Sequence, residues 1–226
     1  MKRTHLKQRG FTLTELMIVV ALVAIFATLA VPNMGGMIAR QRVQGQANEI
    51  ANAFTFAHNE AVRLGKPVFV VPGKVNNNGK LQGTATDWDE ANALLVFADD
   101  DGGVDSTKAQ KYNTGEDLRV VSLNSQIKLE EISRESLGAA LSGDDDNKMT
   151  FVYYSNGQMR IKDNGTALQA PGAIGRIMLK DPKRTTKNQV TRFCEVIRVD
   201  ATGRTSVYAG KRTDLNKNKD DFFYCE

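Results

Sequence analysis

The first 65 residues of the chain carry two hydrophobic patterns in succession. In the first, residues 16–31, fifteen of sixteen positions are apolar and Thr28 is the exception. Extended back to Phe11, the run becomes a helix of about 31 Å, which matches a bilayer hydrocarbon core of about 30 Å. The pattern therefore predicts a transmembrane helix over residues 11–31.

The second pattern is an amphipathic stripe with helical spacing. Its apolar residues recur at alternating steps of four and three: Val43, Ala47, Ile50, Phe54, Ala57, Ala61 and Leu64. Gly65 and Pro67 then form a strong helix stop. We therefore predict one long helix from Thr12 to Leu64, with a kink or soft point near Pro32, Gly35 and Gly36.

Beyond Pro67 the pattern changes to short β-prone runs separated by turn residues. The predicted strands are Val68–Val71, Leu94–Ala98, Leu118–Leu123, Ile127–Ile132, Met149–Tyr154, Arg160–Lys162, Arg176–Leu179, Phe193–Val199 and Thr205–Ala209. Asn156-Gly157 predicts a two-residue type I′ hairpin turn. Because no linker-like break interrupts residues 66–226, we predict that they form one β-rich head. The predicted fold class is α+β, with a long N-terminal helix packed on an antiparallel sheet.

Charge gives the chain an orientation. The net charge is +4, and the first ten residues hold four basic residues and no acid, so the remainder has 26 of each sign. By the positive-inside rule, the leader of residues 1–10 stays in the cytoplasm, whereas residues 32–65 and the head are delivered to the far side of the membrane. Overall basicity therefore gives no argument for a nucleic-acid partner. A cleaved secretory signal, with Ala27, Ala30 and Val31 as its small residues, is the alternative.

Glu15 is the anomaly in the apolar segment, because a carboxylate at a bilayer centre costs about 2.5–3.5 kcal/mol on insertion scales. It ends the sequence Gly10-Phe11-Thr12-Leu13-Thr14-Glu15, which resembles the processing signature of type IV pilins and type II secretion pseudopilins. The resemblance implies that a prepilin peptidase cuts after Gly10, that Phe11 is N-methylated, and that Glu15 aligns subunits during filament assembly. The alternative is an ordinary signal anchor whose Glu15 snorkels to the headgroups.

Segments of the head resemble the minor pilin family that includes GspH, FimT and FimU. They are Leu94 to Gly102, Glu116 to Arg119, Phe151 to Gly157, and Thr202-Gly203-Arg204. This resemblance implies a structural role in a type IV pilus or its initiating tip complex. Its partners would be other major and minor pilins, and the protein would be a single-pass inner-membrane protein with a periplasmic head that later joins the pilus fibre. A type II secretion pseudopilin remains an alternative.

Candidate catalytic and metal-binding chemistry is sparse. The only histidines are His5 and His58, which provide no constellation for nucleophilic catalysis or zinc. Residues 99–105 look like a truncated calcium loop, but Gln110 stands where the bidentate Glu is needed. We therefore expect neither an enzyme nor a bound metal or cofactor.

Cys194 and Cys225 are the only cysteines, and they suit one disulfide in an oxidising compartment. Such a bond would hold the C-terminal tail to a strand and stabilise the fold by about 3–4 kcal/mol. The spacing does not favour a redox-active thiol pair. Disulfide-tied C-terminal regions also recur in pilins.

The head is bipolar in charge. Residues 87–148 hold fifteen acids and six bases, whereas residues 176–226 hold twelve bases and seven acids. FimT-like proteins are implicated in DNA uptake through a Gly-Arg-x-Arg motif, and the matching positions here are Gly203-Arg204-Thr205-Ser206, without the second Arg. Arg204, with Lys211 and Arg212, is therefore a weak DNA-binding candidate, and a solvated basic face or a subunit contact is favoured.

Overall fold

The computed structural model describes residues 11–85, 88, 90–98, 112, 115–136, 139–140, 150–162, 174–181 and 194–209. The chain divides into two compact units, residues 1–39 and residues 40–226. The second unit, called the head unit below, contains the end of the long helix and all the strands.

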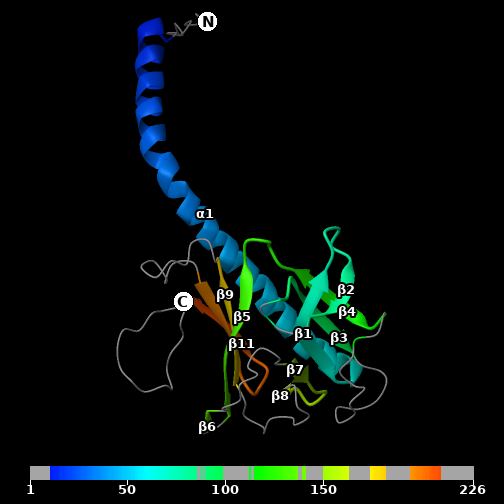
Figure 1. Cartoon of the computed structure of the whole chain (residues 1–226). Coiled ribbons are helices and arrows are strands. Elements are labelled where there is room, and N and C mark those ends of the chain that lie inside the picture. The colour runs from blue at the N-terminus through cyan, green and yellow to red at the C-terminus, as the bar shows by residue number, and fades with distance from the viewer. Residues whose placement is uncertain are drawn as a thin grey trace, which may run out of the picture. The chain divides into compact units, whose positions relative to one another are not determined.

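Helix α1 runs from Leu13 to Leu64 (Figure 1), which confirms the predicted long helix. It stays helical through Pro32 and the glycines that follow. It ends as predicted, because Gly65 has a φ of +66° and its N–H donates to the Ala61 carbonyl at 3.1 Å. Among the described residues, the structure contains no helix with both the length and the apolar character needed to cross a membrane.

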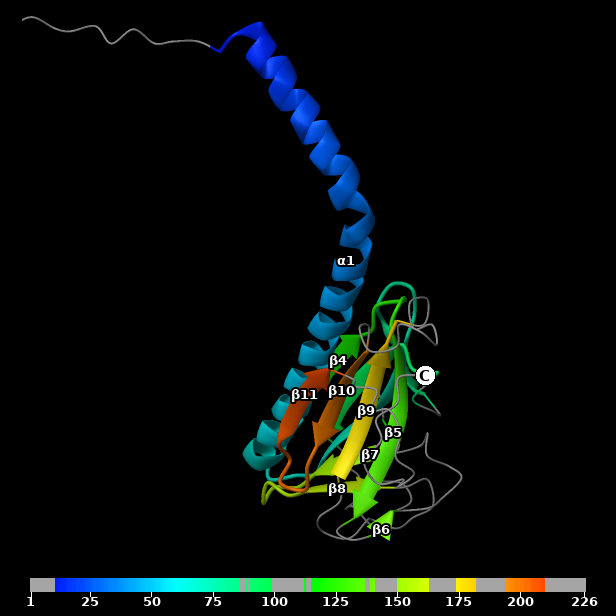
Figure 2. The ribbon, with the colours of Figure 1, turned by 90° about the vertical axis from the view of Figure 1, so that its left-hand side faces the viewer.

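The strands of the head unit form two antiparallel sheets rather than one (Figure 1, Figure 2). The first has the order β4-β3-β1-β7-β8 with β2 also paired to β1, and the second has the order β11-β10-β9-β5-β6. The strands are β1 (Val68–Val75), β2 (Leu81–Thr84), β3 (Ala93–Ala98), β4 (Asp117–Ser122), β5 (Lys128–Ser136), β6 (Ala139–Ala140), β7 (Thr150–Tyr153), β8 (Met159–Lys162), β9 (Ile174–Lys180), β10 (Cys194–Val199) and β11 (Thr205–Ala209). Each predicted strand overlaps one of these, and β2 and β6 were not predicted.

The main core lies where the apolar stripe of α1 meets both sheets. The stripe residues from Val43 to Ala61 are buried, and Leu64 packs against them at the helix end. The first sheet contributes Val68, Val70, Leu94, Val96, Phe151 and Tyr153, and the second contributes Leu129, Ile177, Leu179, Ile197 and Val199. Both sheets thus pack against one face of α1 in a shared core. The helical periodicity predicted that this apolar face would be buried.

A second, smaller cluster covers the other face of the first sheet. Its buried residues are Phe69, Val71, Leu95, Phe97 and Val152. They alternate along β1 and β3 with residues of the main core, because successive side chains of a strand point to opposite faces. These two strands are therefore buried on both sides, which explains why their sequences are continuous apolar runs.

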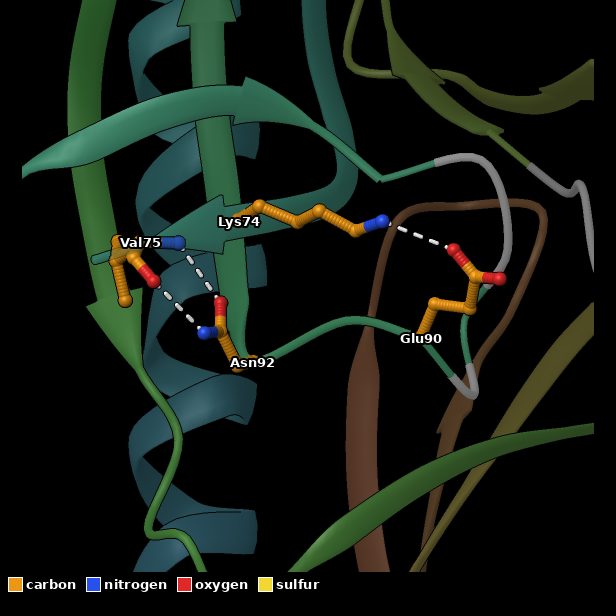
Figure 3. Close-up of polar contacts among 4 residues, drawn as sticks. All are labelled: Lys74, Val75, Glu90 and Asn92. Carbon is orange, nitrogen blue, oxygen red and sulfur yellow. Dashed lines mark hydrogen bonds and ion pairs between the residues drawn. The ribbon is translucent and has the colours of Figure 1, made fainter. Parts of the chain in front are cut away.

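The side chain of Asn92 forms hydrogen bonds with the backbone at the irregular end of β1 (Figure 3). The β1–β2 register shifts between Lys74 and Val75. The side-chain carbonyl of Asn92 accepts from the Val75 N–H at 2.7 Å, and its amide donates to the Val75 carbonyl at 2.8 Å. Nearby, Lys74 and Glu90 form an ion pair at 2.9 Å, but both side chains are exposed, so the pair adds little stability.

Three hairpins share one turn geometry, which corrects the predicted type I′ turn. At Tyr154–Gln158, the Tyr154 N–H donates to the Gln158 carbonyl at 3.0 Å and the Gly157 N–H donates to the Tyr154 carbonyl at 2.9 Å. The loop is therefore a three-residue turn closed by a left-handed glycine, the common alternative to a two-residue turn. The same bonds close Asn76–Lys80 and Asp200–Arg204, and their glycines have φ values of +74° and +79°.

Candidate assembly interface and head sites

The beginning of α1 is a capping box built by Thr12 and Glu15. The Glu15 N–H donates to the Thr12 hydroxyl at 3.3 Å, and the Thr12 N–H donates to a Glu15 carboxylate oxygen at 3.5 Å. This reciprocal pair satisfies helix N–H groups that would otherwise lack a partner. The predicted alignment residue thus also caps its own helix. The Thr12-x-x-Glu15 spacing is itself the sequence signal of a capping box.

Apolar side chains are exposed along the first turns of the helix. Phe11 is 84% exposed. The other exposed large apolar residues of this segment are Leu13, Leu16, Met17, Ile18, Val19, Val20, Leu22, Val23, Ile25 and Phe26. So extensive an apolar surface marks a site that binds another apolar surface. Gly10, the predicted cleavage position, lies outside the described residues.

Polar contacts join the C-terminal part of α1 to the end of β4 and the loop between β4 and β5. Gln46, which is 8% exposed, donates to the Ser122 carbonyl at 3.4 Å and accepts from the Asn124 N–H at 3.0 Å. Arg42 donates to the Gln126 side chain. Within the head unit, these bonds fix the C-terminal part of α1 to the end of β4 and the β4–β5 loop. No pattern in the sequence pointed to Gln46, because its partners lie far away along the chain.

Arg204, the first candidate DNA contact, is exposed and follows the β10–β11 turn. Its N–H and the N–H and hydroxyl of Thr202 all donate to one carboxylate oxygen of Asp200, at 3.0, 3.0 and 2.6 Å. The turn backbone is therefore fixed, whereas the Arg204 side chain extends into solvent. Lys211 and Arg212 lie outside the described residues, so the grouping of the three cations stays a prediction.

His58 lies between the β7–β8 and β10–β11 turns. Its ring packs edge-on against the ring of Tyr153, with centroids 5.7 Å apart. Tyr153 is fully buried, and this burial raises the pKa of its hydroxyl. Tyr153 thus acts as a packing residue that supports His58.

Cys194 begins β10 and is disulfide-bonded, whereas Cys225 lies outside the described residues. The neighbouring Glu195 is buried, with 6% of its surface exposed. Burial raises the pKa of the Glu195 carboxyl, and the positive charge of Arg40 on α1 offsets part of this rise. An acidic group therefore lies buried on the same strand as the disulfide-bonded Cys194, near Arg40 of α1.

The described part of the chain contains no cluster of His, Cys, Asp and Glu that could hold a metal ion. The calcium-like segment of residues 99–105 lies outside the described residues.

Comparison with known proteins gives matches over the helix and the head. The prokaryotic N-terminal methylation motif matches residues 5–31, and the family model for the type II transport protein GspH matches residues 46–203. Two fimbrial proteins of Pseudomonas aeruginosa are each 41% identical over 61 residues, which is 27% of this chain. The chain spans only 39% of the length of these curated relatives.

Two crystal structures of the type IV minor pilin FimU from Pseudomonas aeruginosa PAO1 are also similar. They are 15% and 14% identical to this chain, and both have a TM-score of 0.39. The alignments cover 73% and 75% of this chain and 91% and 90% of FimU. Because the GspH model alone matches residues 46–203 of the 226, the protein belongs to the GspH family of minor pilins and pseudopilins.

Proposed function

We propose that this protein is a minor pilin, or pseudopilin, that is incorporated into a type IV pilus or its initiating tip complex. The observation that carries the proposal is the exposed apolar surface of residues 11–26, on a helix that begins two residues after Phe11. This segment lies within the matched methylation motif. Cleavage after Gly10 by a prepilin peptidase would make Phe11 the N-terminal residue and place its methylated amine beside the capped first turn.

Assembly would then be driven by packing. Burial of apolar surface stabilises an association by about 25 cal/mol per Å², so helices of other major and minor pilins would cover the side chains from Phe11 to Phe26. Before assembly, the inner membrane would cover the same residues, with the head in the periplasm. No helix among the described residues is both long and apolar enough to cross a membrane, so the support for membrane insertion is the exposed apolar side chains of residues 11–26.

Glu15 would align the incoming subunit through its charge. A carboxylate inside an apolar bundle is costly unless a positive group pairs with it, and the α-amine at Phe11 of a neighbouring pilin supplies one. The first-turn position also favours a negative charge by about 0.3–1 kcal/mol through the helix dipole. The capping bond and the charge are separate properties of Glu15, so substitutions can separate them.

Two variants test this role. Glu15→Gln removes the charge but keeps an oxygen that can accept from the Thr12 N–H, whereas Glu15→Ala removes both. We expect both variants to reach the membrane at normal levels and both to be depleted from sheared fibres. If Glu15→Gln enters fibres normally while Glu15→Ala does not, the residue acts through capping and the alignment proposal is wrong.

The filament could instead be a type II secretion pseudopilus, since the family model carries the name of a type II transport protein. Deleting the gene distinguishes the two systems, because a type IV pilus supports twitching and a pseudopilus supports secretion. We expect deletion to reduce twitching and leave secretion intact. Loss of secretion with normal twitching would assign the protein to the secretion system.

DNA capture is a second candidate function, favoured by the exposed Arg204 on a rigid turn. It predicts that the purified protein retards duplex DNA, that salt weakens the complex, and that Arg204→Ala weakens it further. Retardation that is unchanged in Arg204→Ala would remove this turn from consideration.

The partner of Cys194 is proposed to be Cys225, the other cysteine in the chain. A bond between them would hold the C-terminal segment to β10. Peptide mapping without reduction should recover the two cysteines in one linked fragment. Recovery of Cys194 linked to a second copy of the chain would contradict this pairing.

A further inference from the structure

A surface pocket of about 510 Å³ lies between α1 and two hairpin turns of the head unit. His58 reaches it from the helix, Asn156 and Gln158 from the β7–β8 turn, and Thr202 from the β10–β11 turn, with Met159 beside them. The volume falls within the range of about 300–1,000 Å³ that is usual for small-molecule sites. Neither the pilin role nor the DNA candidate uses this pocket.

The walls of the pocket are fixed by the fold. A Cβ added at Gly157 would lie 3.2 Å from His58 Nε2, and one added at Gly203 would lie 3.1 Å from His58 Cδ2 and 2.9 Å from Tyr153 Cε1. Both glycines also have positive φ values, which other residues rarely adopt. The backbone of the two turns therefore approaches the imidazole as closely as only glycine allows.

A further bond ties the two turns together. The N–H of Met159, at the start of β8, donates to the carbonyl of Ala201 at 3.2 Å. Because these turns belong to different sheets, this bond fixes the spacing of the two walls. The pocket is thus formed before any ligand arrives, which lowers the entropy cost of binding.

The lining offers neutral hydrogen-bonding groups. Asn156 uses its carbonyl oxygen to accept from the Gln158 N–H at 3.0 Å, so its NH₂ group remains available. Thr202 donates its hydroxyl to Asp200 and can still accept. Within the described part of the chain, we find no hydrogen bond from either ring nitrogen of His58 or from the side-chain amide of Gln158.

Full charges are absent from the described lining residues. Asp200, a carboxylate on the β10–β11 turn, accepts three hydrogen bonds from its own turn at one oxygen. An anionic ligand would therefore lose its hydration without gaining a full positive charge from these lining residues. A carboxamide, by contrast, presents a donor and an acceptor side by side, which suits a pair of adjacent hydroxyl groups.

From this combination, we propose that the pocket binds a neutral sugar ring. The carboxamides of Asn156 and Gln158 and the hydroxyl of Thr202 bond to its hydroxyl groups, and the His58 ring packs against its C–H face. The proposal concerns the head unit alone and does not depend on processing, membrane anchoring or entry into a fibre.

His58 provides the reporter for a direct test. The chain contains only two histidines, so the imidazole signals of the full chain are few and a His58→Gln variant assigns them. The protein is labelled at histidine, prepared without a histidine tag and kept in a detergent that has no sugar headgroup. N-acetylglucosamine, galactose and glucose are then titrated at millimolar concentrations, and we expect a saturable shift of the His58 signal with at least one of them.

Matched variants locate the binding. Gln158→Ala should weaken the binding about three- to tenfold, the usual effect of losing one hydrogen bond. Lys80→Ala is the control, because Lys80 is exposed at the equivalent position of the β1–β2 turn and does not line the pocket. It should leave the affinity unchanged, and glucuronate should bind more weakly than glucose.

Three results would overturn the proposal. The first is the absence of a saturable His58 shift with every sugar tested. The second is an equal affinity in Gln158→Ala and the unmodified chain, which would place the binding elsewhere. The third is a His58 shift that appears only when another pilin is added, which would make the pocket a subunit contact.

Discussion

Gly175 on β9 of the second sheet lies directly against Phe151 on β7 of the first sheet. A Cβ added there would lie 2.3 Å from Phe151 Cε1, 2.7 Å from Phe151 Cζ and 3.2 Å from Ile161 Cδ1. Phe151 is fully buried and has little room to move, because its ring lies edge-on to Phe54 at 4.9 Å and to Trp88 at 6.1 Å. We therefore expect Gly175→Ala to destabilise the head unit.

The size of the effect follows from overpacking. Forcing one methyl group into a close-packed core costs about 1–3 kcal/mol, which corresponds to a fall in Tm of about 2–12 °C for a domain of this size. The assay is urea unfolding followed by the fluorescence of Trp88, the only tryptophan in the chain and a fully buried neighbour of Phe151. The expected result is a lower unfolding midpoint.

Two further variants test whether the cause is steric. Gly45→Ala makes the same change on α1, where a Cβ would meet no atom within 4 Å. It should stabilise the protein by about 0.5–1 kcal/mol, because glycine is a poor helix residue. Adding Phe151→Leu to Gly175→Ala should cost less than the sum of the two single changes. An unchanged midpoint in Gly175→Ala, or strict additivity in the double variant, would refute the reasoning.

Two other predictions concern polar groups under the helix. Gln46→Ala should destabilise the head unit by about 1–3 kcal/mol, because it leaves backbone groups of the β4–β5 loop unpaired. Denaturation beside the exposed control Gln44→Ala, which should change little, checks this, and equal effects would contradict it. Burial raises the pKa of Glu195 above its usual 4.5 and Arg40 offsets part of the rise, so the folded chain holds this proton more tightly. The contribution of Glu195 to the free energy of unfolding is therefore full below the pKa that its carboxyl has in the unfolded chain. It falls as the pH rises through the pKa of the folded chain. Glu195→Gln should reduce this loss of stability between acidic and neutral pH, and an identical pH profile would refute the assignment.

Local patterns predicted much of the fold. The helix from Thr12 to Leu64 could be anticipated because its stripe has helical spacing and Gly65 ends it. Strands β1 and β3 could be anticipated because they are buried on both faces and therefore carry unbroken apolar runs. In each case, the signal and the structure lie in the same short segment of chain.

The parts that were not predicted depend on contacts between distant segments. Strand β2 has only four residues, and its side chains are half-buried or exposed, so no apolar run marks it. The division into two sheets depends on which strands pair, and propensity says nothing about partners. At Asn156-Gly157, the turn residues were recognised, but the hydrogen bonds place the turn one residue earlier.

The candidate sites show the same difference between contiguous motifs, which could be predicted, and contacts between distant segments, which could not. Phe11 and Glu15 were found because they belong to a contiguous motif. The pocket at His58 was missed because its lining comes from a helix and two turns that are widely separated in sequence. Arg204 was found by motif, but its neighbours in space could only come from the structure.

The central claim is that the chain becomes a pilin subunit by losing its leader, and intact-mass spectrometry tests it most directly. The protein should be extracted from the membranes of cells with an active prepilin peptidase and compared with protein from cells that lack the enzyme. The account predicts a chain that begins at N-methylated Phe11 in the first sample and at Met1 in the second. A chain that still begins at Met1 in both samples would contradict it.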